Sequence, residues 1–334
     1  MTGLRIGVLG AARIAPNALI KPARAMADVT VAAVAARDRA RATAFAGRHG
    51  IPIVHDDYAQ LLADETLDAI YNPLPNGLHG RWTIAALDAG KHVLCEKPFT
   101  ANADEARAVA EAAAGTDLVV MEAFHYRYHP VALRMLEIVT SGQLGELRHV
   151  EAGFCFPLPR FADIRYRADL AGGALMDAGC YAVHMVRLLG GAVGGDSEPE
   201  VLSAKAKLRA KDVDRAMRAE LRFPGGHTGT ITCSMWSSDL LKISARAVGT
   251  QGEMRVRNPL APQVGHRIAV RTASGRRTEH LSRRSSYSYQ LDAFADAVRD
   301  GAPVVTDPAD AIRTMTVIDA IYRAAGLAPR EPSA

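Results

Sequence analysis

Two charged residues, Glu96 and Lys97, follow the apolar stretch HVLC and stand directly before Pro98. The stretch is typical of a buried strand, and Pro98 ends strand pairing because proline has no N–H to donate. Ligands of open parallel sheets bind outside the carboxyl ends of the strands, so the pair would face a crevice. A lysine there can have its pKa lowered by desolvation and can take part in proton transfer. A structural ion pair at a strand end is the alternative that these residues leave open.

A second group of polar side chains lies in GGALMDAGCYAVH, residues 172–184. On a helix, Asp177, Tyr181 and His184 are separated by four and then three residues and share one face. The other sides of that helix are apolar. Such a stripe is either a satisfied network in the core or one wall of a cleft, and the spacing alone favours the network.

The segment MEAFHYRYHP, residues 121–130, stands where the pattern of the chain changes. Tyr126, Arg127 and Tyr128 could donate hydrogen bonds to a polyhydroxylated ligand there. An aromatic seam between two domains is the alternative.

A degenerate dinucleotide fingerprint follows the first apolar strand, LRIGVL. Gly10 can make the tight turn, and Ala12 stands where the backbone must approach a pyrophosphate. A tight turn between strand and helix, without a ligand, is the alternative. The residues assigned to the cofactor here are Gly10, Ala12, Arg13 and Ile14.

The choice of cofactor is read at the end of the second strand, where NAD-binding proteins commonly carry an acidic residue. Here Arg37 occupies that region, with Arg41 one helical turn further on. These guanidinium groups could hold a 2′-phosphate, which favours NADP over NAD. In the alternative both arginines face solvent and Asp38 only caps the helix.

The segment YNPLPNGLH, residues 71–79, is irregular backbone at another strand end. It could line a nicotinamide pocket through Pro75, Asn76 and His79. A proline-shaped connection, with His79 in the first turn of a helix, is the alternative.

The elements that must position these residues change character near residue 123. Before it, short apolar strands alternate with amphipathic helices, which predicts a doubly wound parallel sheet of the Rossmann type. After it, strand-like runs between Gly and Pro turns predict an α+β domain on a large, mostly antiparallel sheet. The expected domains are 1–122 for the dinucleotide and 123–330 for substrate and oligomerisation, with the last helix packing back on the first domain. The strands expected in the first domain are 4–9, 29–35, 68–72, 92–95 and 118–121.

Composition excludes several classes of protein. With 49% hydrophobic and 23% charged residues the chain is an ordinary globular protein, and no apolar run approaches the roughly 20 residues that cross a bilayer. The start, MTGLRIGVLG, runs directly into a strand with no signal peptide, so a cytoplasmic location is expected. The net charge of +4 is spread along the chain without aromatic residues in its densest run, which argues against nucleic-acid binding. The four cysteines are widely spaced, which suits a reducing compartment and argues against a metal site.

Taken together, these segments resemble the glucose-fructose oxidoreductase and inositol dehydrogenase family, also written Gfo/Idh/MocA. The resemblance covers nearly the whole chain. It rests on the GxxGxAxIA start, the PNxLH turn, AGKHVLCEKP, the MEAFxYRxHP junction and GGALxDxGCY. It implies a two-domain NAD(P)-dependent oxidoreductase that acts on sugars and related alcohols and forms dimers or tetramers through its large sheet.

The resemblance also implies roles for individual residues. Lys97 is then the catalytic lysine, Asp177 a carboxylate that positions the substrate, and Tyr181 the proton donor or acceptor. Tyrosine at this position resembles the branch with NADP-dependent aldose 1-dehydrogenases, trans-dihydrodiol dehydrogenases and glucose-fructose oxidoreductase. Departures from the family pattern are Ala12 for the usual glycine and Ala36 where serine is common, and the branch gives His184 no fixed role.

The resulting hypothesis is reversible hydride transfer between NADP and a carbinol carbon of an aldose or a cyclic trans-diol. Tyr181 would exchange the hydroxyl proton, and the Lys97 ammonium would favour the tyrosinate. Asp177 would orient the substrate, with Arg127, Tyr128 and His184 as further contacts and Glu96 as a support on the cofactor side. The alternatives are a keto- or anhydro-sugar reductase working in the opposite direction and, in a different class, an NADP-binding sensor or scaffold without turnover.

Overall fold

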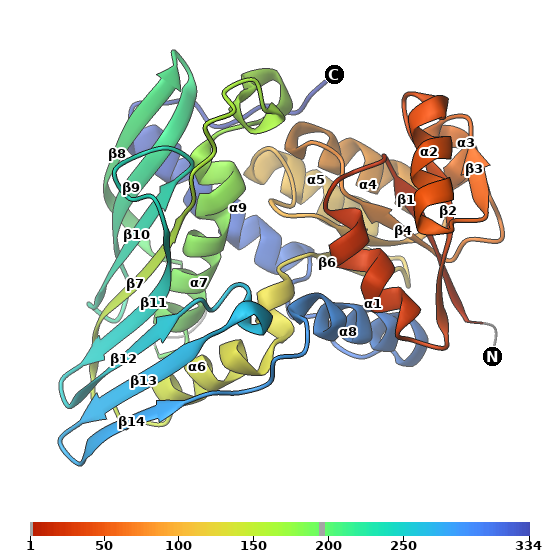
Figure 1. Ribbon diagram of the computed structural model, residues 1–334. Helices are drawn as coiled ribbons and strands as arrows, with labels where there is room; N and C mark the ends of the chain where they lie inside the picture. The colour runs from red at the N-terminus through yellow and green to blue at the C-terminus, as the bar shows by residue number, and fades with distance from the viewer. Residues whose placement is uncertain (1–2, 194–197) are drawn as a thin grey trace.

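Two β-sheets with helices between and around them make up the molecule (Figure 1). The structure is a computed structural model that describes residues 3–193 and 198–334. One sheet has six strands and the other has eight. The predicted combination of a Rossmann-type domain with a larger, mostly antiparallel sheet is confirmed.

The six-stranded sheet is entirely parallel, with the order β3-β2-β1-β4-β5-β6. This is the order of a doubly wound sheet. The strands up to β3 are added on one side of β1 and those from β4 onward on its other side, which leaves a crevice at the carboxyl ends of β1 and β4. Buried apolar side chains on both faces account for strands without polar alternation. The strands are β1 (Leu4–Leu9), β2 (Val29–Ala35), β3 (Ile53–His55), β4 (Ala69–Asn72), β5 (His92–Cys95) and β6 (Val120–Glu122).

Most of these strands match the sequence-based prediction to within two residues. β3 is the exception, because three half-buried residues with no extended apolar run give too little signal. The helices that connect the strands are α1 (Lys21–Arg24, after a π-turn at Pro16–Ile20), α2 (Arg39–His49), α3 (Tyr58–Leu62), α4 (His79–Asp88) and α5 (Ala103–Ala113).

Side-chain caps fix where two of these helices begin. The Asp38 carboxylate accepts from the backbone N–H groups of Ala40 and Arg41 and starts α2, which ends at Gly50 in the left-handed conformation. Asn102 accepts from the N–H of Glu105 and starts α5. Both caps satisfy N–H groups that the first helical turn leaves without a partner. They also hold the strand-to-helix turns that border the crevice.

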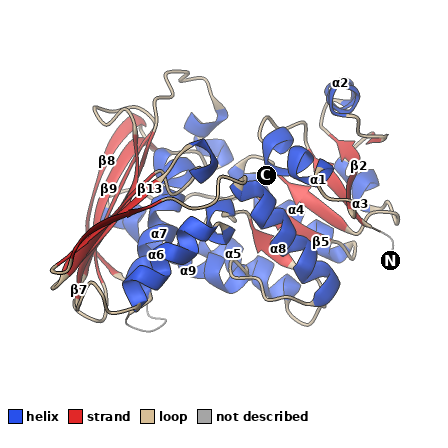
Figure 2. Ribbon diagram, turned by 60° about the horizontal axis from the view of Figure 1, so that its bottom comes forward, coloured by secondary structure: helices blue, strands red, loops and turns tan. Residues whose placement is uncertain are grey.

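The eight-stranded sheet has the order β14-β13-β12-β11-β7-β10-β9-β8. All its pairs are antiparallel except β7 with β10, which is parallel. Helices cover one face, and Figure 2 shows the other face without helices. The strands are β7 (Leu147–Cys155), β8 (Glu200–Ala210), β9 (Val213–Arg222), β10 (Thr228–Ser234), β11 (Lys242–Gly249), β12 (Gly252–Arg257), β13 (Arg267–Thr272) and β14 (Gly275–Glu279).

The covering helices are almost completely apolar toward the sheet. α7 (Cys180–Gly191) follows a π-turn at Leu175–Gly179 and is buried along nearly its whole length. α6 (Pro130–Thr140) begins at His129, whose side chain accepts from the N–H of Val131. The π-turn and the first turn of α7 carry Asp177 and Tyr181. These polar side chains lie at the end of α7 that is nearer to the six-stranded sheet.

The two closing helices tie the halves together. In α8 (Ser286–Asp300), Leu291, Phe294 and Ala295 belong to the hydrophobic core around β1 and β2. In α9 (Pro308–Ala324), the Asp319 carboxylate accepts from the N–H of Ala103 at the start of α5, over 3.1 Å. The last helix therefore contacts α5, while the division into domains near residue 122 stays a prediction. Among the described residues, we find no helix with the length and apolar character to cross a membrane.

Candidate active site

A cavity of about 610 Å³ opens where the carboxyl ends of β1, β4 and β5 meet the first turns of α7. Residues from both halves of the chain line it, so neither half forms it alone. Its lining comprises Ala11, Ala12, Arg13, Ile14, Arg41, Pro73, Leu74, Pro75, Asn76, His79, Glu96, Lys97, Phe154, Phe156, Ala162, Asp163, Ile164, Arg165, Leu170, Asp177, Tyr181 and Tyr287.

The turn after β1 has the backbone that a dinucleotide requires. Gly10 has a φ of +84°, a conformation that a side chain strains, and a Cβ there would meet Leu74 Cδ2 at 3.1 Å. The next residues, Ala12, Arg13 and Ile14, line the cavity themselves. Gly10 thus shapes the turn, and the residues after it border the cavity.

The two arginines of the second strand end differ in position. Arg41, in the first turn of α2, lines the cavity, whereas Arg37 is exposed and lies outside the lining. The Asp38 cap at Arg41 N fixes the backbone of that turn. Of the two arginines, Arg41 is thus the one that borders the cavity.

The loop after β4 closes the cavity from the side. Pro75 and Asn76 line it, and the Asn76 amide donates to the carbonyl oxygen of Ala171 in the other half of the chain, over 3.2 Å. His79 is almost fully buried, and its ring nitrogens contact the carbonyl oxygens of Leu74 and Pro98, each at 2.7 Å. Burial lowers the pKa of His79 to about 4, and the ring lies between this loop and the turn that carries Lys97.

At the end of β5, the side chains of Glu96 and Lys97 contact different partners. The Glu96 carboxylate accepts from the Tyr71 hydroxyl at 2.7 Å, and burial raises its pKa against the opposing effect of the Lys97 ammonium. The Lys97 ammonium crosses to the other half of the chain, where it donates to the Asp177 carbonyl oxygen at 3.1 Å and lies 3.7 Å from the Asp177 carboxylate. It also lies 5.1 Å from the centre of the Tyr181 ring.

The pKa of Lys97 moves in the opposite direction to the sequence-based expectation. Burial alone would lower it, but the negative charges around it, with Asp177 first, outweigh burial and the pKa is raised. Lys97 therefore carries its proton in the protein alone.

Asp177 is shared between two cations. Besides Lys97, its carboxylate accepts from Arg165 Nε at 2.9 Å, and Arg165 in turn donates to Asp163 at 3.1 Å. The Asp177 carboxylate raises the pKa of Arg165. Sequence reasoning missed Arg165 and Asp163, because they stand in a loop between β7 and α7 without a recognisable motif.

Tyr181 lies one turn beyond Asp177 and keeps its proton. Its side chain is only 7% exposed, and burial raises the pKa of its hydroxyl well above the ordinary value of 10.0. The hydroxyl contacts His125 Nε2 at 3.1 Å. The tyrosinate that Lys97 would favour during the reaction stays a prediction, since the raised pKa describes the protein alone.

Three residues expected at the substrate do not reach the cavity. The Tyr128 hydroxyl bonds to Thr306 at 2.7 Å, and Arg127 and His184 line a separate cavity. His184 is 2% exposed and stacks on Phe124, whose ring also contacts Tyr181 edge-on. His184 lies seven residues beyond Asp177 along the same helical run, away from the cavity, and Phe124 packs against the rings of both His184 and Tyr181.

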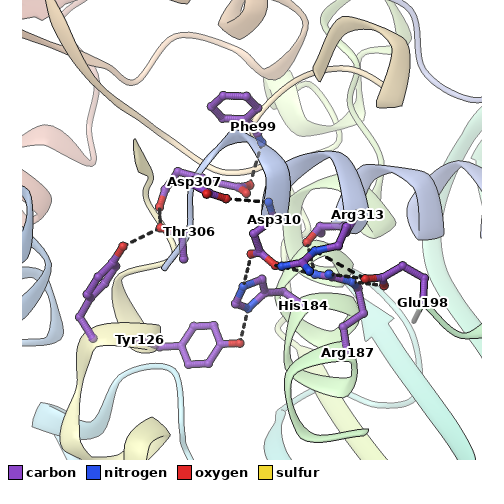
Figure 3. A network of polar contacts seen from close by, with 12 residues as sticks. Phe99, Tyr126, His184, Arg187, Glu198, Thr306, Asp307, Asp310 and Arg313 are labelled. Carbon is purple, nitrogen blue, oxygen red and sulfur yellow. Dashed lines mark hydrogen bonds and ion pairs between the residues drawn. The ribbon is translucent and has the colours of Figure 1, made fainter. Parts of the chain in front are cut away.

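His184 belongs instead to a buried polar network between α7 and α9 (Figure 3). Its ring contacts the Tyr126 hydroxyl at 2.6 Å and the Asp310 carboxylate at 2.9 Å, and Arg187 also binds Asp310. Burial alone would raise the pKa of Asp310, but His184 and Arg187 outweigh it and the pKa is lowered. Both interpretations of this polar stripe therefore hold, each for a different part of it. Asp177, in the π-turn, and Tyr181, on α7, line the cavity, whereas His184 belongs to a polar network in the core.

A dinucleotide turn, a lysine and a tyrosine that share one cavity with a carboxylate define a nucleotide-dependent oxidoreductase of two domains. Comparison with known families agrees. Residues 4–124 match the GFO/IDH/MocA oxidoreductase family with its NAD-binding Rossmann fold, and residues 132–255 match the GFO/IDH/MocA C-terminal domain. The chain belongs to the GFO/IDH/MocA family, which confirms the resemblance found in the sequence.

Relatives are similar along nearly the whole chain. D-xylose 1-dehydrogenase (NADP(+)) 2 of Haloferax volcanii is 38% identical over 96% of this chain and 97% of that protein. Trans-1,2-dihydrobenzene-1,2-diol dehydrogenase of Mus musculus is 34% identical over 78% of this chain and 76% of its own. The crystal structure of KijD10, a 3-ketoreductase from Actinomadura kijaniata in complex with NADP and TDP-benzene, has a TM-score of 0.88 at 30% identity, covering 96% of this chain and 98% of that one.

Proposed function

We propose that this protein is an NADP-dependent oxidoreductase that transfers a hydride to or from a CH–OH carbon of a sugar or related polyol. The observation that carries the proposal is the meeting of Lys97, Asp177 and Tyr181 in the cavity that also contains the dinucleotide turn. Relatives named for D-xylose, for a dihydrodiol and for a dideoxy-keto-sugar support the class of substrate.

The residues present fit NADP. The turn at Gly10 allows a pyrophosphate to approach the backbone, and Arg13 and Arg41 line the cavity with positive charge. NADP would supply the hydride chemistry, and this chain would supply binding, orientation and proton transfer. Arg37, exposed beside Arg41, is a further candidate for the 2′-phosphate, and Pro75 and Asn76 for the nicotinamide side.

Each polar residue on the substrate side has one task in the proposed reaction. Tyr181, protonated in the free protein, gives its proton to the oxygen of a carbonyl and takes it back from an alcohol. The Lys97 ammonium stabilises negative charge on the same oxygen. Asp177, held by Arg165, accepts hydrogen bonds from a neighbouring hydroxyl and so fixes which carbon faces the cofactor.

The charges of the substrate side favour an uncharged substrate. Asp163 and Asp177 already engage Arg165, and Asp177 also engages Lys97. The two carboxylates and the two cations balance one another, which favours a substrate without net charge. We therefore propose a neutral aldose or cyclic diol.

Assembly and location belong to the same proposal. We propose a homodimer or homotetramer through the helix-free face of the eight-stranded sheet, where Glu220, Thr230, Glu151, Arg246 and Arg255 form one polar row across the strands. Light scattering of the purified protein tests this. The cytoplasm is the proposed location, since all four cysteines are buried free thiols, which is typical of a reducing compartment.

The experiment for the activity is a screen of aldoses, polyols and cyclic diols with NADP, following the absorbance of the reduced nicotinamide. Turnover of at least one neutral sugar or diol is expected, with NADP preferred over NAD by kcat/KM. Tight NADPH binding without turnover of any compound would instead identify a sensor or scaffold.

A further inference from the structure

The Tyr181 hydroxyl is the first member of a buried hydrogen-bonded chain. Tyr181 contacts His125 Nε2 at 3.1 Å, and His125 Nδ1 contacts Ser286 Oγ at 2.9 Å. The Ser286 hydroxyl then lies 3.2 Å from the side-chain oxygen of Gln263. These four residues come from four different elements: α7, the short 3₁₀ helix His125–Tyr128, α8 and the 3₁₀ helix Pro262–Val264.

The contacts of Gln263, at the end of this hydrogen-bonded series, determine which atom donates in each of its hydrogen bonds. The backbone N–H of Ser286 also points at the Gln263 oxygen, at 3.4 Å, which identifies that atom as the acceptor end of the amide. Because this oxygen cannot donate, the Ser286 hydroxyl gives it its single proton. Ser286 Oγ can then only accept, so the proton of His125 must be on Nδ1.

The pKa of His125 decides whether its ring carries one proton or two. Burial is the largest effect on its pKa, which the Lys97 ammonium lowers further, to about 3. The ring is thus neutral, and with Nδ1 protonated its Nε2 is a bare acceptor. Tyr181 must therefore donate its hydroxyl proton to His125, not to the cavity.

We propose that His125, held in this tautomer by Ser286 and Gln263, is the positioning residue of Tyr181 and turns the lone pairs of the tyrosine oxygen toward the substrate. The free site then presents a hydrogen-bond acceptor, which suits an alcohol, since an alcohol can donate and a ketone cannot. This inference rests on the proposed function, because it assigns a reaction to Tyr181.

The tautomer can be measured without any substrate. Histidine labelled with nitrogen isotopes, in the full-length protein, gives an NMR signal for His125 that the His125→Phe variant lacks and thereby assigns. We expect a protonated Nδ1 and a bare Nε2 at neutral pH, with this preference weakened in Ser286→Ala. A protonated Nε2 in the wild-type protein would overturn the proposal, whether or not the protein turns over any sugar.

Kinetics of three matched variants test the positioning. A glutamine amide reaches the position of imidazole Nε2, and an asparagine amide reaches that of Nδ1. We therefore expect roughly a tenfold lower kcat in His125→Phe and His125→Asn, from the loss of one hydrogen bond to the reacting group, and recovery of most of it in His125→Gln. The KM for the alcohol should rise relative to that for the carbonyl product in the two impaired variants.

A purely structural role for His125 predicts a different result. All three variants would then lose thermal stability and NADPH affinity together, and glutamine would not differ from asparagine. That outcome, or a kcat of His125→Phe equal to that of the wild type, would overturn the positioning role. Failure of the wild-type protein to turn over any sugar would overturn the proposed function instead, and the NMR measurement would still decide the tautomer.

Discussion

The Nζ atom of Lys97 and the Oδ1 atom of Asp177 lie 3.7 Å apart, although 80 residues separate them in the chain. The contact joins the carboxyl end of β5 to the π-turn that precedes α7. Both side chains are largely buried, so the pair is weakly screened by solvent and salt. In the proposed reaction this pair lies beside the substrate oxygen and its neighbouring hydroxyl.

Replacing Tyr181 by Phe should abolish most of the activity. The phenol is the proton donor and acceptor in the proposed reaction, and such a group contributes roughly a hundredfold to ten-thousandfold to the rate. We expect a fall in kcat of that size, with NADPH binding, measured by fluorescence, unchanged. The matched control is Tyr128→Phe, which lies outside the cavity and should turn over at nearly the wild-type rate. Near-normal turnover of Tyr181→Phe would contradict the assignment.

Replacing Lys97 by Met should lower kcat by at least roughly a hundredfold, the cost of removing one preorganised electrostatic group from a buried site. Asp177 keeps its bond to Arg165 in this variant, so the loop before α7 should hold its position. Circular dichroism and NADPH affinity check that the fold and the cofactor site remain. The exposed Lys205→Met on β8 serves as control, and equal kcat values for the two variants would exclude a role for Lys97 in turnover.

Replacing Arg41 by Ala should reduce the preference for NADP over NAD. A charge-assisted hydrogen bond to a phosphate contributes about 1.5–3 kcal/mol, so we expect a loss of about tenfold or more in the ratio of the two kcat/KM values. Arg39→Ala is the matched control, because Arg39 is exposed and pairs with Asp56. If both variants keep the wild-type ratio, the 2′-phosphate is bound elsewhere, with Arg37 and Arg13 the next candidates.

Asp319 should make the stability of the protein depend on pH. Burial raises its pKa from 3.8 to about 6 in the folded state, and one of its oxygens has no partner. Between these values the folded protein binds more protons than the unfolded chain, so this group lowers the free energy of unfolding as pH rises from about 4 to above 6. The shift corresponds to at most about 3 kcal/mol.

The Asp319→Asn variant tests this linkage. Asparagine can still accept from the N–H of Ala103 but carries no charge to desolvate. In urea denaturation we expect it to be more stable than the wild type by about 1–2 kcal/mol near pH 8, by about half as much near pH 5, and about equal to it near pH 3. A difference independent of pH would show that Asp319 is not the titrating group.

The sequence by itself determined the fold class, the family and the short-range parts of the site. Strands buried on both faces, helix caps at Asp38 and Asn102, and the turn at Gly10 all follow from local rules of backbone geometry and hydrogen bonding. Lys97, Asp177 and Tyr181 could be singled out because each stands in a dense, recognisable motif. In each of these motifs, residues close by in the sequence determine the local backbone that carries the functional side chain.

Only the tertiary structure decided which side chains meet. His125 and Arg165 were missed because they contact Tyr181 and Asp177 across 56 and 12 residues, through elements whose packing no local pattern specifies. Arg127, Tyr128 and His184 were assigned to the substrate from their spacing, yet packing turns them toward α9 and Thr306. The direction of the pKa shift of Lys97 was likewise beyond the sequence, because it depends on the distance to a carboxylate in the other half of the chain.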